Sequence, residues 1–290
     1  MAEFLQFLFS GVTVGAIYAL VALGFSIIYN ASHVINFAQG EFVMIGGMAT
    51  VFLSAAGLPL PLAMLAAIAI AVVAGLALQW LAVGRSGDAS VVTLIIITIG
   101  ASIFLRGVAS VLWGTDFHSF PAFSGDQPIA IAGATLTPQS LWVLGVTLLI
   151  AAGLLAFFGH TLLGKAMLAT AHNRLAAQLV GINTRLVTLF SFGLAAALGA
   201  IGGILITPIA PTSYQVGIML GLKGFSAAIV GGLGSGLGAI VGGLVVGIAE
   251  QMAAGYLSSA YKDAIAFVII LLVLFFMPSG LFGAKTTERV

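Results

Sequence analysis

The chain has 290 residues, of which 61% are hydrophobic and 6% are charged. A soluble domain carries about 25% charged residues, so this composition excludes a water-soluble globule and indicates a multi-pass membrane protein. The nine Lys and Arg residues nearly balance the eight Asp and Glu residues, which leaves too little positive charge for a nucleic-acid partner. The sequence contains no cysteine, so disulfides and thiolate metal sites are excluded.

Long apolar runs predict helices that cross a lipid bilayer. Each crossing needs about 20 mainly apolar residues, and the runs are continuous and too long for the strands of a membrane barrel. The predicted spans are 4–29, 36–56, 59–83, 90–113, 141–160, 185–208 and 263–283, with a glycine-interrupted region at 217–256 that contributes one or two crossings. We therefore expect an all-α polytopic membrane protein, with eight or nine helical segments in one transmembrane domain over residues 1–290.

The charges in the loops predict the orientation, because short cytoplasmic loops are enriched in Lys and Arg. The loop that follows the fifth span has three basic residues and no acidic one, so we expect it to be cytoplasmic. The loop before that span contains Asp116 and Asp126 without a basic residue and is expected outside. Counting spans from these loops places the N-terminus outside and the tail, with Lys285 and Arg289, inside the cell.

Two ionisable residues, Glu41 and Lys223, lie next to apolar helix, where charge is costly and often functional. Asn36, Phe37 and Gln39 precede Glu41 at the expected start of an interrupted helix. We expect these five residues near the translocation path, with Glu41 facing protein rather than lipid. The alternative is that each charge is an interfacial or helix-end residue.

The segments after the two charges are loosely alike, which suggests an internal repeat. Residues 40–47 and 224–232 both begin with glycine and end with a glycine pair. On the orientation above they enter the membrane from opposite sides, as in an inverted repeat with interrupted helices; chance likeness between Gly- and Ala-rich helices is the alternative.

Arg106, inside the fourth span, is expected to extend towards the outer interface.

A glycine block follows Lys223, with seven glycines between Gly231 and Gly243. Within it, Gly234, Gly238 and Gly242 are spaced four residues apart, a spacing that lets helix backbones approach closely in lipid. We expect these three to serve helix packing or a re-entrant turn, with direct ligand contact as the alternative.

The loop 161–184 mixes charged and apolar residues at helical spacing. Met167, Leu168, Ala171, Leu175 and Leu179 form one apolar stripe, and Lys165, His172 and Arg174 lie off it. Most plain connections are shorter, so we expect a helix that docks on another protein; a helix lying on the membrane surface is the alternative.

Catalytic motifs are missing, so we do not expect an enzyme. Neither a His-Glu-x-x-His zinc motif nor a Gly-x-Ser-x-Gly nucleophile elbow occurs. The segment from Gly159 to Lys165 has P-loop spacing, but Ala166 replaces the residue that would hold magnesium, and a membrane helix precedes it. ATP binding by this chain is therefore not expected.

Three stretches of the chain resemble a known family. They are Gly15–Gly24 with Val34–Glu41, then Gly164–Asn183, and then Lys223–Gly243 with Ile248–Glu250 and Met277–Gly283. Together they are similar to the LivH-type permease subunits of branched-chain amino-acid ABC importers, over nearly the whole chain. Gln39 departs from the family, in which histidine is common at this position, so a substrate role for Gln39 does not follow from the resemblance.

The resemblance implies an all-helical permease in the bacterial cytoplasmic membrane. Its partners would be a second related permease, two cytoplasmic ATPases that bind the ATP, and an extracytoplasmic binding protein, and the chain itself would hold no cofactor or metal. The loop 161–184 would receive the ATPase stroke through Gly164, Lys165, His172, Asn173, Arg174 and Gly181. Urea and short-amide importers share this permease type, so they remain alternatives for the substrate.

A secondary transporter or channel driven by an ion gradient is the alternative from another class. It would need intramembrane carboxylates to couple ions. Glu41 is the main candidate and Glu250 a weaker one, whereas a proton relay normally contains more such groups.

Overall fold

The computed structural model describes residues 1–86, 89–125 and 127–283, so Asp126, Lys285 and Arg289 lie outside the described residues. The helices are α1 (Ala2–Ser32), α2 (Gln39–Ala55), α3 (Leu60–Leu81), α4 (Val91–Trp113), α5 (Pro138–His160), α6 (Leu162–His172), α7 (Arg174–Leu179), α8 (Thr184–Ile206), α9 (Val216–Gly231), α10 (Gly236–Tyr256) and α11 (Lys262–Phe276). Short 3-10 turns at Val83–Arg85 and Ser259–Tyr261 follow α3 and precede α11, and a small hairpin joins β1 (Ile129–Ile131) to β2 (Ala134–Leu136).

Within the described part of the chain, seven helices are long and apolar enough to cross a membrane: α1, α3, α4, α5, α8, α10 and α11. Helix α11 has 15 residues and reaches this length together with the 3-10 turn that precedes it, over Ser259–Phe276. Helices α2 and α9, at 17 and 16 residues, fall short of it. The expected all-α membrane fold is confirmed, and most span boundaries agree within a few residues. The glycine-interrupted region contributes two helices, α9 and α10, and the hairpin is an element that the sequence analysis did not predict.

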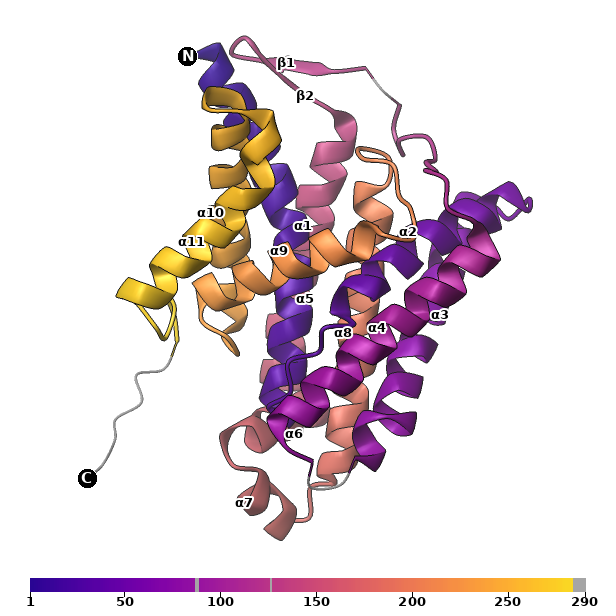
Figure 1. Ribbon diagram of the computed structural model, residues 1–290, viewed down its shortest axis with the longest axis vertical. Helices are drawn as coiled ribbons and strands as arrows, with labels where there is room; N and C mark the ends of the chain where they lie inside the picture. The colour runs from indigo at the N-terminus through magenta and orange to yellow at the C-terminus, as the bar shows by residue number, and fades with distance from the viewer. Residues whose placement is uncertain (87–88, 126, 284–290) are drawn as a thin grey trace.

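The shorter helices α2 and α9 lie inside the bundle (Figure 1). Helix α1 ends where His33 adopts a left-handed conformation, with φ 54°. The chain then runs without helix to Asn36, whose Oδ1 accepts a hydrogen bond from the Ala38 amide at 3.1 Å, before α2 begins at Gln39. Helix α9 begins after the loop that follows α8 and runs across the bundle in Figure 1. The expected interrupted helices are therefore α2 and α9.

The two halves of the bundle pack in the same way with opposite directions. Helix α1 packs on α9 and α10, while α8 packs on α2 and α3, and α2 contacts α4 as α9 contacts α11. At the centre, a Cβ added to Gly40 would overlap the Gly217 carbonyl oxygen, and one added to Gly217 would lie 2.7 Å from the Gly40 carbonyl oxygen. This contact lies at the centre of the two halves, and Gly40 and Gly217 are each the second residue of their helix, so the repeat aligns Gly40 with Gly217. The expected alignment with Gly224 is wrong.

Glycines allow the closest helix contacts in the bundle. A Cβ on Gly243 would lie 2.7 Å from the Ala19 Cα of α1, and one on Gly242 would overlap the Ala227 carbonyl of α9. Gly238 likewise contacts the Gly231 carbonyl. Gly234 lies instead in the turn between α9 and α10 with φ 92°, where its carbonyl accepts a hydrogen bond from Asn30 Nδ2 at 2.7 Å.

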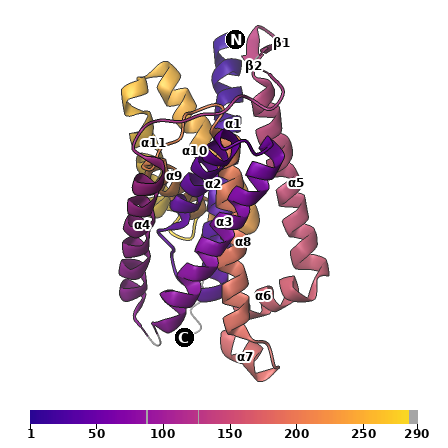
Figure 2. The same ribbon diagram turned by 90° about the vertical axis from the view of Figure 1, so that its right-hand side faces the viewer.

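The two ends of the bundle carry different connecting segments. The β1–β2 hairpin lies near the N-terminus at the upper end in Figure 1, and α6 and α7 lie at the lower end; Figure 2 shows α5 joining the two ends. The segment 161–184 is not one helix, because Asn173 adopts an extended conformation and its Oδ1 accepts from the Ala176 amide as the cap of α7. The expected apolar stripe is therefore split: Met167 is buried, while Leu175 and Leu179 are exposed.

Candidate functional site

The first polar cluster of the interior forms around Glu41, in the first turn of α2. Its side chain is buried, with 1% of the residue exposed. Oε1 accepts a hydrogen bond from Ser102 Oγ of α4 at 2.7 Å and lies 3.3 Å from Arg106 Nε on the same helix. The guanidinium of Arg106 therefore points to a carboxylate inside the protein. The expectation that Arg106 extends to the outer interface is wrong, because its ion pair with Glu41 offsets the cost of the buried charge.

The residues before Glu41 hold the break between α1 and α2 in shape. Asn36 and Gln39 are fully buried, and Gln39 Nε2 donates to the Ala195 carbonyl of α8 at 2.9 Å. The amide of Phe37 donates to Thr98 Oγ1 of α4 at 3.3 Å, which ties the break to α4. Asn36 and Gln39 are therefore surrounded by protein and held by contacts with other parts of the bundle.

A cavity of about 130 Å³ lies between α2, α4 and α9 beside Glu41. Glu41, Ser102 and Arg106 form the polar part of its lining, and Gly217 and Gly221 of α9 also line it. A Cβ at position 217 would lie 2.6 Å from Glu41 Oε2, so a residue larger than glycine there would displace the carboxylate.

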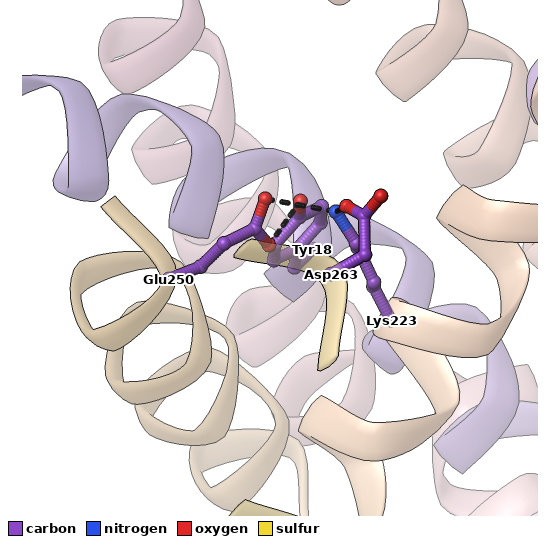
Figure 3. A network of polar contacts seen from close by, with 4 residues as sticks. All are labelled: Tyr18, Lys223, Glu250 and Asp263. Atoms are coloured by element: carbon purple, nitrogen blue, oxygen red, sulfur yellow. Dashed lines mark hydrogen bonds and ion pairs between the residues drawn. The ribbon is translucent and has the colours of Figure 1, made fainter. Parts of the chain in front are cut away.

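The second polar cluster forms around Lys223 of α9 (Figure 3). Its Nζ donates to Glu250 Oε1 of α10 at 2.8 Å and to Asp263 Oδ1 of α11 at 2.6 Å. The hydroxyl of Tyr18 on α1 donates to Glu250 Oε2 at 2.8 Å. Four helices therefore meet at one cation and two carboxylates, of which Lys223 and Glu250 are buried and Asp263 is partly exposed.

Helix α9 separates the two clusters. Gly217 and Gly221 line the cavity beside Glu41, whereas Lys223 lines a different cavity of about 280 Å³ that also contains Tyr18 and Glu250. The structure therefore brings Asn36, Phe37, Gln39 and Glu41 together and places Lys223 on the other side of the helix. Each cluster pairs opposite charges across helices, which lowers the cost of ionised groups at membrane depth.

The sequence does not single out Tyr18, Ser102 and Asp263 as partners in the two clusters, and it points to Glu250 only as a candidate ion-coupling group. Ser102 and Arg106 are four residues apart and so share one face of α4, which is the signal that could have paired them with Glu41. Among the residues that the structure describes, no group of three or more His, Asp or Glu side chains could hold a metal ion.

The residues expected to contact an ATPase lie on α6, α7 and their ends. Lys165, His172 and Arg174 are exposed, and Asn173 caps α7. Gly164 is buried where a Cβ would overlap the Phe157 carbonyl of α5, and Gly181 has φ 88°. The two glycines therefore lie at the turns of this segment, and the side chains of Lys165, His172 and Arg174 are available to a partner.

Comparisons with known proteins agree along almost the whole chain. Residues 7–274 match the family model described as branched-chain amino acid transport system / permease component. The chain is 34% identical to the high-affinity branched-chain amino acid transport system permease protein LivH of Escherichia coli (strain K12), with 99% of this chain and 98% of that protein covered. It is 33% identical to the corresponding permease protein BraD of Pseudomonas aeruginosa, with the same coverage.

The fold also matches a solved structure. A chain of PsaBC from Streptococcus pneumoniae in complex with Fab aligns with a TM-score of 0.51 and 17% sequence identity, covering 97% of this chain and 94% of that one. This identity supports the fold alone, whereas the family match covers residues 7–274 and the two relatives cover 99% of the chain. The chain is a multi-pass membrane protein, and it belongs to the family of branched-chain amino acid transport system permease components.

Proposed function

We propose that this chain is the membrane-spanning permease subunit of an ATP-driven importer for branched-chain or related hydrophobic amino acids. The observation that carries the proposal is the 34% identity to LivH of Escherichia coli over 99% of the chain. The interior supports a transport role, because two buried charge clusters lie on the two sides of the interrupted helix α9. Asn36, Phe37, Gln39, Glu41 and Lys223 are the residues we place along the substrate path.

The energy source in this proposal is ATP bound by partner subunits. The chain has no complete P-loop, so two cytoplasmic ATPases would supply the stroke. Helices α6 and α7 would receive it, since Arg174 is exposed there beside Leu175 and Leu179, whose exposed fractions are 73% and 88%. Exposed leucines next to a cation are typical of a docking surface.

The remaining partners follow from the same assignment. A second, related permease would complete the pathway, and an extracytoplasmic binding protein would deliver the amino acid. We place the complex in the bacterial cytoplasmic membrane, with the β1–β2 hairpin and the N-terminus outside and α6, α7 and the C-terminal tail in the cytoplasm, as the loop charges favour.

Reconstitution with the partner subunits tests the proposed substrate class. The chain, its second permease and its ATPases would be purified as one complex, and ATP hydrolysis measured with binding protein loaded with leucine, urea or acetamide. We expect leucine-loaded binding protein to stimulate hydrolysis several-fold over unloaded protein. Stimulation by urea or acetamide but not by leucine would reassign the substrate, and hydrolysis by the chain alone would contradict the permease role.

A further inference from the structure

The cavity beside Glu41 contains an unused hydrogen-bond acceptor. Oε1 of Glu41 is occupied by Ser102 and faces Arg106, but Oε2 has no hydrogen-bond partner among the residues that the structure describes. The residue is 1% exposed, and a buried carboxylate oxygen without a donor is costly. A ligand that brings a donor into this cavity would remove that cost.

The same cavity also offers a cation. Arg106 lines it with a side chain that is 24% exposed, and its Nε makes no hydrogen bond of good geometry within the described residues. A guanidinium has five N–H donors in a planar fork that matches a carboxylate. A carboxylate and a guanidinium thus line the same cavity, with Glu41 Oε1 3.3 Å from Arg106 Nε.

The rest of the lining is apolar and narrow. Phe25, Phe37, Ile99, Ile218 and Leu222 line the cavity with Gly217 and Gly221. Its volume of about 130 Å³ is close to that of an engineered apolar cavity, about 150 Å³, that binds benzene, so it suits a small molecule. Gly217 and Gly221 line it on α9, and a Cβ at either position would meet Glu41 Oε2 or the Gly40 backbone, so the two glycines let α9 lie close to the carboxylate.

We propose that this cavity binds an aliphatic α-amino acid as a zwitterion, with its ammonium group on Glu41 Oε2 and its carboxylate on the Arg106 guanidinium. The aliphatic side chain lies against Phe37, Ile99 and Leu222. The site lies within the permease and is separate from any binding protein. This assignment rests on the proposed function, because it names the molecule that the permease would hold in transit.

The Lys223 cluster fits this ligand less well. Glu250 has both oxygens hydrogen-bonded, to Lys223 and to Tyr18, and Lys223 already faces two carboxylates. An amino acid would have to break these contacts before binding. The cavity beside Glu41 requires no such exchange for the ammonium group, so the structure favours it.

Binding of leucine to the purified full-length chain in lipid nanodiscs tests the site without a binding protein or ATP. Labelled leucine would be displaced by unlabelled leucine, by leucinamide, which lacks the carboxylate, or by 4-methylpentanoate, which lacks the ammonium group. We expect saturable binding in which each analogue competes at least about tenfold more weakly than leucine. That difference corresponds to the loss of one charge-assisted contact.

Two variants test which side chain binds the carboxylate of leucine and which binds its ammonium group. Arg106→Gln should lower the affinity for leucine and abolish the preference for leucine over leucinamide, while Glu41→Gln should abolish the preference over 4-methylpentanoate. Glu3→Gln and Arg185→Gln, the same changes at exposed positions, should change neither preference. Thermal unfolding and gel filtration would show that each variant is folded, and the wild-type preferences stand as a test even where a variant is not.

The proposal is overturned if the folded wild-type chain shows no saturable leucine binding, or if it binds leucine and both analogues equally. It is also overturned if folded Glu41→Gln and Arg106→Gln keep the wild-type preferences, since the ion pair would then be structural. If leucine does not bind to this cavity, ATP-driven import by the whole complex can still be observed, and the proposed function would stand. Conversely, leucine binding without ATP-driven import would support the site and contradict the proposed function.

Discussion

At the scale of single residues, the charged side chains inside the bundle form ion pairs, and the stability of the fold depends on keeping both members of a buried pair. Lys223 is 6% exposed and contacts Glu250 and Asp263 from two other helices. Breaking a buried pair by removing one partner leaves the other charge uncompensated and costs about 3–5 kcal/mol. The buried carboxylate of Glu250 therefore depends on Lys223 for its stability in the folded chain.

We expect Lys223→Met to destabilise the protein by several kcal/mol, because Glu250 would remain buried without its cation. The double variant Lys223→Met/Glu250→Gln should regain part of this loss, since the uncompensated carboxylate is gone. Thermal unfolding in detergent measures both, with Lys165→Met at an exposed position as the control. A melting temperature of Lys223→Met equal to that of the control would show that the pairs contribute nothing to stability.

The intramembrane ionisable residues could be found from the sequence, but their partners could not. Glu41 and Lys223 stand out because charge is rare in apolar helices. The contacts join residues that are far apart in the chain: Ser102 lies 61 residues from Glu41, and Asp263 lies 40 residues from Lys223. Such pairs depend on how helices pack, which hydropathy does not encode, and Arg106 was therefore assigned to the interface incorrectly.

At the scale of helices, glycine positions set the distances between α1, α9 and α10. In lipid, helix association relies on close packing and hydrogen bonds instead of a hydrophobic driving force. Gly243 on α10 lies against the backbone of Ala19 on α1. Gly153 on α5 has open space where a Cβ would stand among the described residues. Gly→Ala at these two positions therefore measures how much the close helix contact contributes to the stability of the fold.

Gly243→Ala should destabilise the chain by about 1–3 kcal/mol, the usual cost of overpacking, because the added Cβ meets backbone atoms that cannot move alone. Gly153→Ala should leave stability unchanged or raise it slightly, since alanine favours helix over glycine. Unfolding curves of both variants in detergent provide the comparison. Equal melting temperatures would mean that α1 and α10 adjust freely and that the glycine contact is dispensable.

The segment of α6 and α7 is the proposed receiver of the ATPase stroke. Arg174→Glu should uncouple transport from ATP hydrolysis in the reconstituted complex, because a reversed charge cannot make the charge-assisted contact, worth about 1.5–3 kcal/mol. Leu175→Asp should weaken docking in the same way. Leucine delivery by the binding protein should be unaffected.

Transport and ATPase co-purification would be measured together, with Arg85→Glu as the same change at another exposed arginine. If Arg174→Glu and Leu175→Asp both transport leucine normally with normal ATPase assembly, the segment is only a connector.

The presence of helix in this segment could be predicted from its periodicity. Its division into two helices could have been recognised only from the capping preference of asparagine at position 173.

At the scale of the whole molecule, two oppositely directed halves surround the crossing of α2 and α9. Helices α1 to α4 and α8 to α11 make corresponding contacts. The number of spans follows from hydropathy, and the interrupted helices follow from the glycine and polar residues at their ends. The register of the repeat did not follow, because Gly/Ala-rich helices resemble one another in several alignments; the starts of α2 at Gln39 and of α9 at Val216 distinguish them.

The absence of cysteine from the chain makes its orientation directly measurable. Ala130→Cys in the hairpin and Gln178→Cys in α7 each introduce one thiol at an exposed position on opposite ends of the bundle. We expect a membrane-impermeant maleimide applied to intact cells with a permeable outer envelope to label the first and not the second. Labelling in the reverse order would invert the proposed topology.

The dependence of leucine uptake on ATP tests most directly whether the chain is the permease of an ATP-driven importer. Leucine uptake would be measured in proteoliposomes that contain the chain with its second permease and ATPases, with ATP inside and binding protein outside, and in vesicles from which the ATPases are omitted. We expect concentrative uptake only with the ATPases and hydrolysable ATP, and none from a proton or sodium gradient alone. Uptake driven by an ion gradient without the ATPases would contradict the account and favour a secondary transporter.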